Sequence, residues 1–336
     1  MQWSDYGPLL VGGVGLSVVK HLCLKYVTWR HKVNSKEVAT IDAIYFYPFK
    51  SLKGIKVEEC DVTHAALRYK GVSDRTFMIV DDNDEMIIMR QQPTLCLVTP
   101  SIRDDKLWLQ AEGMADVCLP LKQMPSKNSI IRTITKHFIN LKGMDCGDTI
   151  ANWFNKYLNK TNLRVIYFYE QEVLIQKEMI GFQSFLEQYS KPWDMTTFSE
   201  ASPLTLMSQE SVDDLNTRLD EEDKIMLGNF RMNLIVKGCD PYAEDFWDVF
   251  YIGDQTKIHM WSANPRCIAC NINTTTGIRN KNFQPLKGLL KYRPGTEFRA
   301  TLSKDLQKFF ANNPMMGIFC GVDVGGTIKV GDIVRA

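Results

Sequence analysis

The sequence has little of what many hydrolases and nucleotide-binding enzymes rely on. Only five histidines occur, and no two of them are spaced as H-x-x-x-H or H-E-x-x-H. A G-x-S-x-G nucleophile elbow, a Walker A loop and a helix-opening G-x-G-x-x-G are also missing. Catalytic zinc sites, many serine hydrolases and most phosphate-binding loops depend on such motifs. The sequence therefore disfavours these three classes of enzyme.

An excess of positive charge is missing too. The 336 residues include 40 Lys+Arg and 39 Asp+Glu, and 45% of them are hydrophobic. Nucleic-acid-binding domains usually carry a clear basic excess, so we expect no nucleic-acid partner. The composition is that of a well-packed globular protein, long enough for one large domain or two ordinary ones.

The cysteines do not form a disulfide pattern. There are nine of them, an odd number scattered along the chain, and only Cys267 and Cys270 lie close together. In a long chain this arrangement indicates reduced thiols, most of them buried.

The N-terminal residues 1–36 differ from the rest. Residues 8–19 are apolar, and with the stretch up to Trp29 they reach roughly the 20 residues that a bilayer requires. Arg30 and further cations follow the apolar run, which suits an N-out, C-in signal anchor, with Lys20 snorkelling to the interface. We expect a membrane anchor and linker here; an amphipathic or disordered leader is the alternative.

The remainder predicts a mixed α/β fold that is rich in β-sheet. Short runs of β-type residues between turn clusters predict strands at 43–49, 55–62, 76–80, 86–89, 95–102, 163–169, 203–207, 233–236, 249–252 and 257–261, and two more around the turn at Gly331-Asp332. Apolar residues at helical spacing predict helices at 148–158, with Asp148 as N-cap, and at 208–219. The polar stretch 171–194 is the expected boundary in this barrel-like sheet.

The run Asn264-Pro265-Arg266-Cys267-Ile268-Ala269-Cys270 is the strongest candidate for chemistry. A cysteine thiolate suits soft or high-valent metals, and Arg266 would favour its charged form. Two other interpretations stay open. One is a buried structural cysteine beside a surface arginine. The other is a thioredoxin-like dithiol, although the Asn- and Thr-rich run that follows is a poor helix former.

A second candidate is a set of cations at strand ends. Lys50 and Ser51 lie in Tyr47-Pro48-Phe49-Lys50-Ser51-Leu52-Lys53-Gly54, which combines charge, a hydroxyl and a glycine as phosphate sites do. Arg75 and Arg231 open two later strands, and arginine can grip phosphate with two hydrogen bonds. Taken singly, each of these cations is also consistent with a solvated position on the surface. Together they would form an anion-binding site if the fold places them side by side.

Taken in order, these motifs resemble the MOSC superfamily and, within it, the membrane-anchored mitochondrial amidoxime-reducing components. The N-terminal β-barrel domain of that family is resembled by the run from Tyr47 to Gly54, by Asp74-Arg75 and by Arg90-Gln91-Gln92-Pro93. The MOSC domain is resembled by residues 229–233, 238–247, 265–267 and 326–332. The resemblance implies an N-terminal β-barrel domain at 37–175 and a MOSC-type β-barrel domain at 176–336.

The resemblance also implies a molybdenum cofactor, molybdopterin, with its dithiolene on the metal and Cys267 as the protein ligand. The residues that it implies for the pterin and its phosphate are Lys50, Ser51, Arg75, Ser202, Arg231 and Asn233, and we count Arg266 with them.

The implied reaction is the two-electron reduction of amidoximes, hydroxylamines and N-hydroxylated bases: R–NHOH plus two electrons and two protons gives R–NH₂ and water. Nitrite is a further substrate of this kind. Electrons would come from NADH through cytochrome b5 reductase and cytochrome b5, at the outer mitochondrial membrane, with the catalytic part facing the cytosol. The alternatives are a cofactor-binding or sulfur-carrier MOSC module without reductase activity, and a non-catalytic adaptor.

The chain departs from the family pattern in two places that bear on substrate range. Met232 stands where the family usually has proline, and residues 271–276 lack the aspartate and proline that usually follow the cysteine. Asp240, Glu244 and Asp245 are considered as proton donors, against the alternative of a turn and salt-bridge cluster.

Overall fold

The computed structural model describes residues 35–136, 139–168, 173–174, 191, 194–199, 201–295 and 313–336. The predicted membrane anchor lies almost wholly outside these residues, and so does the predicted boundary between residues 175 and 176. None of the helices within the described ranges combines the length and apolar character needed to cross a membrane.

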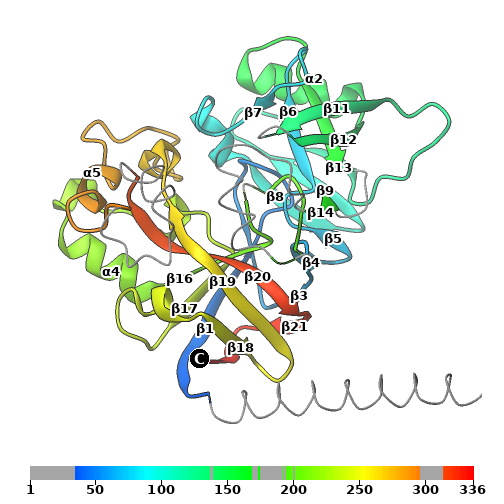
Figure 1. Cartoon of the computed structure of the whole chain (residues 1–336). Helices are drawn as coiled ribbons and strands as arrows, with labels where there is room; N and C mark the ends of the chain where they lie inside the picture. The colour runs from blue at the N-terminus through cyan, green and yellow to red at the C-terminus, as the bar shows by residue number, and fades with distance from the viewer. Residues whose placement is uncertain are drawn as a thin grey trace, which may run out of the picture.

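Seven of the described strands close into a barrel (Figure 1). In order around the ring they are β17 (Leu234–Lys237), β16 (Leu204–Ser208), β20 (Met315–Val324), β19 (Thr256–Pro265), β18 (Val249–Ile252), β22 (Ile333–Arg335) and β1 (Glu37–Phe46), which pairs with β17. Neighbours run antiparallel except β16 and β17, which are parallel. The strand β2 (Ile55–Val57) adds to the edge of β1.

The barrel closes around one apolar core. Along β1 the buried positions alternate with partly exposed ones, as expected of a strand with one face inward. Ile41, Ile44 and Phe46 pack there against side chains from strands at the other end of the chain, including Ile318 and Val334. Burial of these large side chains is the main source of stability for such a ring.

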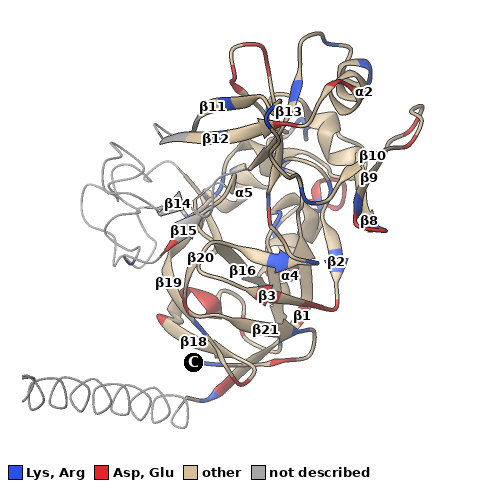
Figure 2. Cartoon of the chain, turned by 90° about the vertical axis from the view of Figure 1, so that its right-hand side faces the viewer, with Lys and Arg blue, Asp and Glu red and all other residues tan. Residues whose placement is uncertain are grey.

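The second unit is built from smaller antiparallel sheets around a separate core. Its five-stranded sheet has the order β11 (Ile131–Lys136), β12 (Ile139–Asp145), β13 (Arg164–Phe168), β6 (Phe77–Val80) and β7 (Met86–Ile87). A three-stranded sheet joins β8 (Thr99–Arg103), β9 (Lys106–Gln110) and β10 (Val117–Pro120), and β14 (Val173–Leu174) pairs with β15 (Met195–Thr196). With α2 (Asp148–Leu158), the five-stranded sheet lies at the opposite end of the molecule from β18 and β21 (Figure 2).

The two units do not follow one another along the chain, because the barrel contains strands from both sides of the second unit in the sequence. The strand β1 comes before the second unit in sequence yet belongs to the barrel. In addition, β21 (Gly326–Lys329) pairs with β3 (Glu59–Val62) in a sheet that continues to β4 (Leu67–Tyr69) and β5 (Val72–Ser73), and Val62, Leu67 and Ile328 of this sheet pack into the barrel core. The barrel therefore combines residues that come before and after the second unit in the sequence.

The remaining helices are short. They are α4 (Gln209–Thr217), α5 (Leu286–Leu289) and the 3-10 helices η2 (Pro93–Leu97), η3 (Glu221–Asp223), η4 (Leu227–Asn229), η5 (Ala243–Phe246) and η6 (Ile268–Asn271). The two predicted helices are confirmed as α2 and α4. In α4 the hydroxyl of Ser208 accepts a hydrogen bond from the backbone N–H of Ser211, which is the geometry of an N-cap.

Three local predictions are wrong. Asp148 is not the N-cap of α2: Gly147 occupies the cap with a φ of 90°, and the Asp148 carboxylate accepts a hydrogen bond from Arg164 at 2.8 Å. The strand predicted at 95–102 begins as the 3-10 helix η2, because Pro93 pre-sets the backbone angle of a first helical turn. The strand predicted at 55–62 is two strands, which pair in different sheets.

Candidate functional site

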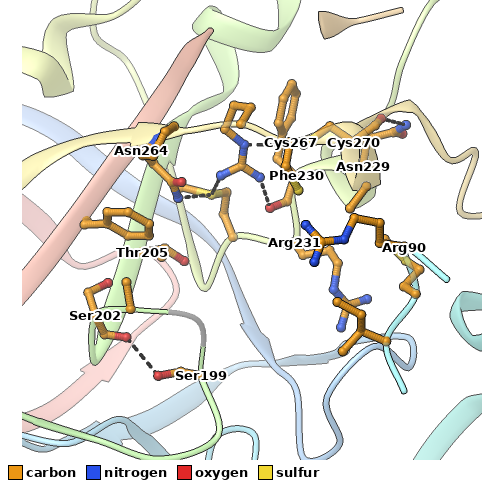
Figure 3. Close-up of a pocket in the computed structure, with 18 of the residues that line it drawn as sticks. Arg90, Ser199, Ser202, Thr205, Asn229, Phe230, Arg231, Asn264, Cys267 and Cys270 are labelled. Carbon is orange, nitrogen blue, oxygen red and sulfur yellow. Dashed lines mark hydrogen bonds between the residues drawn. The ribbon is translucent and has the colours of Figure 1, made fainter. Parts of the chain in front are cut away.

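A cavity of about 470 Å³ lies where the barrel meets the second unit, and both contribute to its walls (Figure 3). All eight residues predicted for the site line it: Lys50, Ser51, Arg75, Ser202, Arg231, Asn233, Arg266 and Cys267. They come from segments more than 200 residues apart in sequence, and the fold brings them to one place.

Cys267 follows the end of β19 and stands just before η6. Its side chain is exposed, whereas that of Cys270 is buried. Burial raises the pKa of the Cys270 thiol, so that thiol stays protonated and is a poor partner for disulfide exchange. Of the two neighbouring sulfurs, the geometry favours Cys267 as the ligand or nucleophile and argues against the dithiol interpretation.

Two side chains fix the segment that carries Cys267. Arg266 is buried: it donates to the Phe230 carbonyl at 2.5 Å, and its Nε lies 3.4 Å from the Cys270 sulfur. Asn229 donates to the carbonyls of Cys270 and Ile272 at 2.9 and 3.0 Å. Arg266 therefore holds the loop in place through Phe230 and Cys270, in addition to bringing positive charge near the thiols.

Arg75 and Arg231 both lie against the ring of Tyr47. Their guanidinium carbons lie 4.7 and 4.6 Å from its centroid, close enough for cation–π attraction. Arg75 also pairs with the buried carboxylate of Asp74 and donates to the Arg231 carbonyl at 3.1 Å. Burial lowers the pKa of Arg231, and its Nη2 is buried with no hydrogen-bond partner among the described residues. A buried donor of this kind calls for an acceptor from a ligand.

Three of the predicted residues have a left-handed backbone. The φ angles are 74° at Ser51, 55° at Arg75 and 54° at Arg231, a region that residues other than glycine seldom adopt. Such conformations are costly and are held in place by their surroundings, most often at binding and catalytic sites. Here the strain directs the three side chains into one cavity.

The polar wall is tied together by hydrogen bonds. Asn233 accepts from the Thr205 hydroxyl at 3.0 Å and from Arg75 at 3.4 Å, and it donates to the Tyr45 carbonyl at 3.2 Å. The ammonium of Lys50 donates to the Phe198 carbonyl at 2.9 Å. These bonds fix positions that would otherwise be free to move, which lowers the entropic cost of binding a ligand.

The sequence motifs gave no role to some of the residues that line the cavity. Arg90, Asn229 and Asn264 stand within motifs that the sequence had singled out, and reading every polar residue of those motifs would have found them. Ser199, Thr205 and Phe319 carry no signal in the sequence. The considered proton donors do not line the cavity: Asp240 is exposed, Glu244 accepts from Ser208 and Ser211, and Asp245 pairs with Arg293 at 2.6 Å.

The charged side chains that line the described part of the cavity all have the same sign. Among the described residues that line it, five are cationic and none is Asp or Glu: Lys50, Arg75, Arg90, Arg231 and Arg266. An exposed thiol, several cations and an unpartnered guanidinium N–H fit a ligand that carries a phosphate together with a soft metal.

Comparison with known proteins finds two domain families in this chain. The MOSC N-terminal beta barrel domain matches residues 38–161, and the MOSC domain matches residues 194–335. The chain is 33% identical over 330 residues to mitochondrial amidoxime reducing component 2 of Rattus norvegicus, covering 96% of this chain and 91% of the relative. It is 31% identical over 337 residues to mitochondrial amidoxime-reducing component 1 of Homo sapiens, covering 98% and 94%.

Proposed function

The chain belongs to the family of MOSC-domain amidoxime-reducing components, and from this premise we propose that it is a molybdenum-dependent reductase of N-hydroxylated compounds. The observation that carries the proposal is the exposed thiol of Cys267 in a cavity whose described charged residues are all cationic. Amidoximes, hydroxylamines and N-hydroxylated bases are the proposed substrates, with nitrite as a further one.

Molybdopterin, when bound, would supply the two-electron redox chemistry. Cys267 would hold the metal, because a thiolate is a soft ligand and this thiol is the exposed one of the pair. The cations Lys50, Arg75 and Arg231 would hold the phosphate, with the pterin held by Ser51, Ser202 and Asn233. Arg266 would position the loop of Cys267 through its bonds to Phe230 and Cys270.

The residues of the cavity support this role by being fixed before a ligand arrives. Tyr47 keeps the guanidinium groups of Arg75 and Arg231 at set positions, and Asp74 neutralises part of their repulsion. A site whose groups are already oriented binds an anion without first reorganising.

We further propose that electrons reach the site from NADH through cytochrome b5 reductase and cytochrome b5. The relatives are named as mitochondrial components, which supports a mitochondrial location for this chain. An outer-membrane position, anchored by the N-terminal segment and with the cavity facing the cytosol, is part of the same proposal.

The direct test is Cys267→Ser in the full chain, expressed in a host that makes molybdenum cofactor. Serine is nearly isosteric but a poor soft-metal ligand, so we expect reduction of benzamidoxime to fall by about 100-fold or more while the fold is retained. Cys118→Ser is the matched control, because Cys118 lies on β10 and does not line the cavity.

Metal analysis and pterin fluorescence accompany the kinetics. We expect about one molybdenum and one pterin per wild-type chain. Full turnover by Cys267→Ser would contradict its role as ligand. A folded wild type that contains neither group would reject the reductase and leave a non-catalytic adaptor.

A further inference from the structure

Arg90 differs from the other cations of the cavity. Lys50, Arg75 and Arg266 each donate to a carbonyl or a carboxylate of the protein, and Arg231 lies against the ring of Tyr47. The Arg90 side chain is exposed, and its guanidinium has no partner among the residues that the structure describes. Lys50, Arg75 and Arg231 are the cations proposed above for the phosphate of the cofactor, which leaves Arg90 as the exposed cation of the described lining with no role assigned so far.

The backbone of Arg90 is held although its side chain is free. In the turn that contains Arg90, Gln91 and Gln92 donate their backbone N–H groups to the Ile88 carbonyl at 2.9 Å each. The backbone N–H of Met89 donates to the Ser51 hydroxyl at 3.0 Å. The Arg90 side chain thus extends from a turn whose backbone is already fixed. Ordering this side chain around a ligand therefore costs little more than the entropy of its own rotamers.

The backbone of Arg90 is also held by a residue from the C-terminal part of the chain, Arg279. Arg279 donates from Nη2 to the Arg90 carbonyl at 2.9 Å, so residues of both units determine where Arg90 stands. In Figure 3, Arg90 lies on the other side of the picture from Ser202 and Thr205, and Arg231 and Cys267 line the same cavity. A ligand in this cavity therefore has both Cys267 and Arg90 in its walls.

The neighbours of Arg90 favour an acidic group on that molecule. No described lining residue is a carboxylate, so a cation brought into the cavity would meet repulsion, whereas an anion would meet an unpartnered guanidinium. We propose that Arg90 selects N-hydroxylated substrates that carry an acidic group, a carboxylate or a phosphate, over neutral and cationic ones. The inference rests on the proposed reductase function and names the substrate class of the same cavity.

The test compares three substrates with a neutral, an anionic and a cationic para position: benzamidoxime, 4-carboxybenzamidoxime and 4-(trimethylammoniomethyl)benzamidoxime. For the wild-type holoenzyme we expect a KM about three- to fivefold lower for the carboxylate than for benzamidoxime, with similar kcat, because an exposed ion pair contributes that much. The difference should shrink as salt is added. A phosphonate analogue then distinguishes carboxylate from phosphate as the preferred group.

Substitutions of Arg90 test whether this residue causes the preference for the carboxylate substrate. Arg90→Ala should lose it, Arg90→Lys should retain part of it, and Arg90→Glu should favour the cationic substrate. Lys106→Ala is the matched control, since Lys106 is an exposed cation on β9 that does not line the cavity, and it should keep the wild-type preference. Equal KM values for the three substrates in the wild type would overturn the proposal.

Two further measurements distinguish a failure of the proposed role of Arg90 from a failure of the proposed reductase function. Loss of pterin from Arg90→Ala would place Arg90 with the cofactor and overturn its role in substrate selection. Calorimetry of 4-carboxybenzamidoxime and benzamidoxime, without an electron donor, measures selection independently of turnover. Selective binding without turnover would reject the reductase and keep the anion site, whereas turnover without selectivity would reject only the role of Arg90.

Discussion

Tyr47 illustrates how one residue organises a charged site. It is buried, and burial raises the pKa of its phenol to about 12, so the ring remains neutral under working conditions. The ring attracts two guanidinium groups that repel each other, and each contact of this kind is worth about 0.5–2 kcal/mol.

We expect Tyr47→Leu to lower the stability of the protein by about 2–4 kcal/mol, from lost packing and lost cation–π attraction. It should also reduce the molybdenum and pterin content. Tyr47→Phe should stay close to wild type, because the hydroxyl makes, within the described part of the chain, only a long contact of 3.4 Å to the Met232 carbonyl. Chemical denaturation and metal analysis measure both effects. Equal losses in the two variants would show that the hydroxyl, and not the ring, matters.

At the scale of residues, the motifs singled out side chains that line one cavity, because its cations stand in recognisable runs; their roles stay predictions. Thr205 could not be found in this way, since within the run 203–207 nothing marks which side chain turns towards another strand. The left-handed backbone at Ser51, Arg75 and Arg231 could not be predicted from the sequence either, because none of these residues is a glycine. These features come from tertiary contacts and not from local preference.

At the scale of elements, periodic segments were predictable and turns less so. The apolar spacing of α2 predicted its bounds, but its cap depended on Gly147 adopting a positive φ. The ten-residue strand β20 was missed: almost all of it is buried, so it lacks the alternation of polar and apolar residues by which strands are recognised.

The strands β19 and β20 also share an ionic cluster. His259 of β19 is buried; its Nδ1 lies 2.8 Å from Asp323 of β20, and its Nε2 lies 3.2 Å from Asp194. Lys191 and Lys257 also pair with Asp323, and Trp261 donates to Asp194 at 3.0 Å. The cluster joins the segment before β15 to the barrel.

Burial alone would lower the pKa of His259, but the hydrogen bonds and charges of Asp194 and Asp323 outweigh it and hold that pKa above its ordinary value. A raised pKa in the folded state stabilises the protein below the ordinary value and loses this contribution as the pH rises through the raised one. We therefore expect His259→Gln to cost more stability at about pH 5.5 than at about pH 9. Urea denaturation at both values measures this; a cost that grows with pH would contradict it.

At the scale of the whole molecule, the barrel depends on strands that come before the second unit in the sequence. Without residues 1–193 the barrel would lack β1, leaving β17 and β22 with unpaired edges, and β21 would lose its partner β3. We expect the isolated fragment 194–336 to aggregate or to show no cooperative unfolding, because open strand edges pair with other chains. Circular dichroism and gel filtration, with the full chain as control, test this. A monomeric fragment with a sharp transition would contradict it.

The ring also has a consequence for how the protein is made. Its first strand, β1, leaves the ribosome before either of its barrel neighbours, β17 and β22, has been made. The nascent protein must keep an apolar strand from pairing wrongly during that interval, and the barrel closes only after β22 has been synthesised. Contacts so distant in sequence form slowly, so cells with few chaperones should yield less of this protein than the stability of its finished fold would suggest.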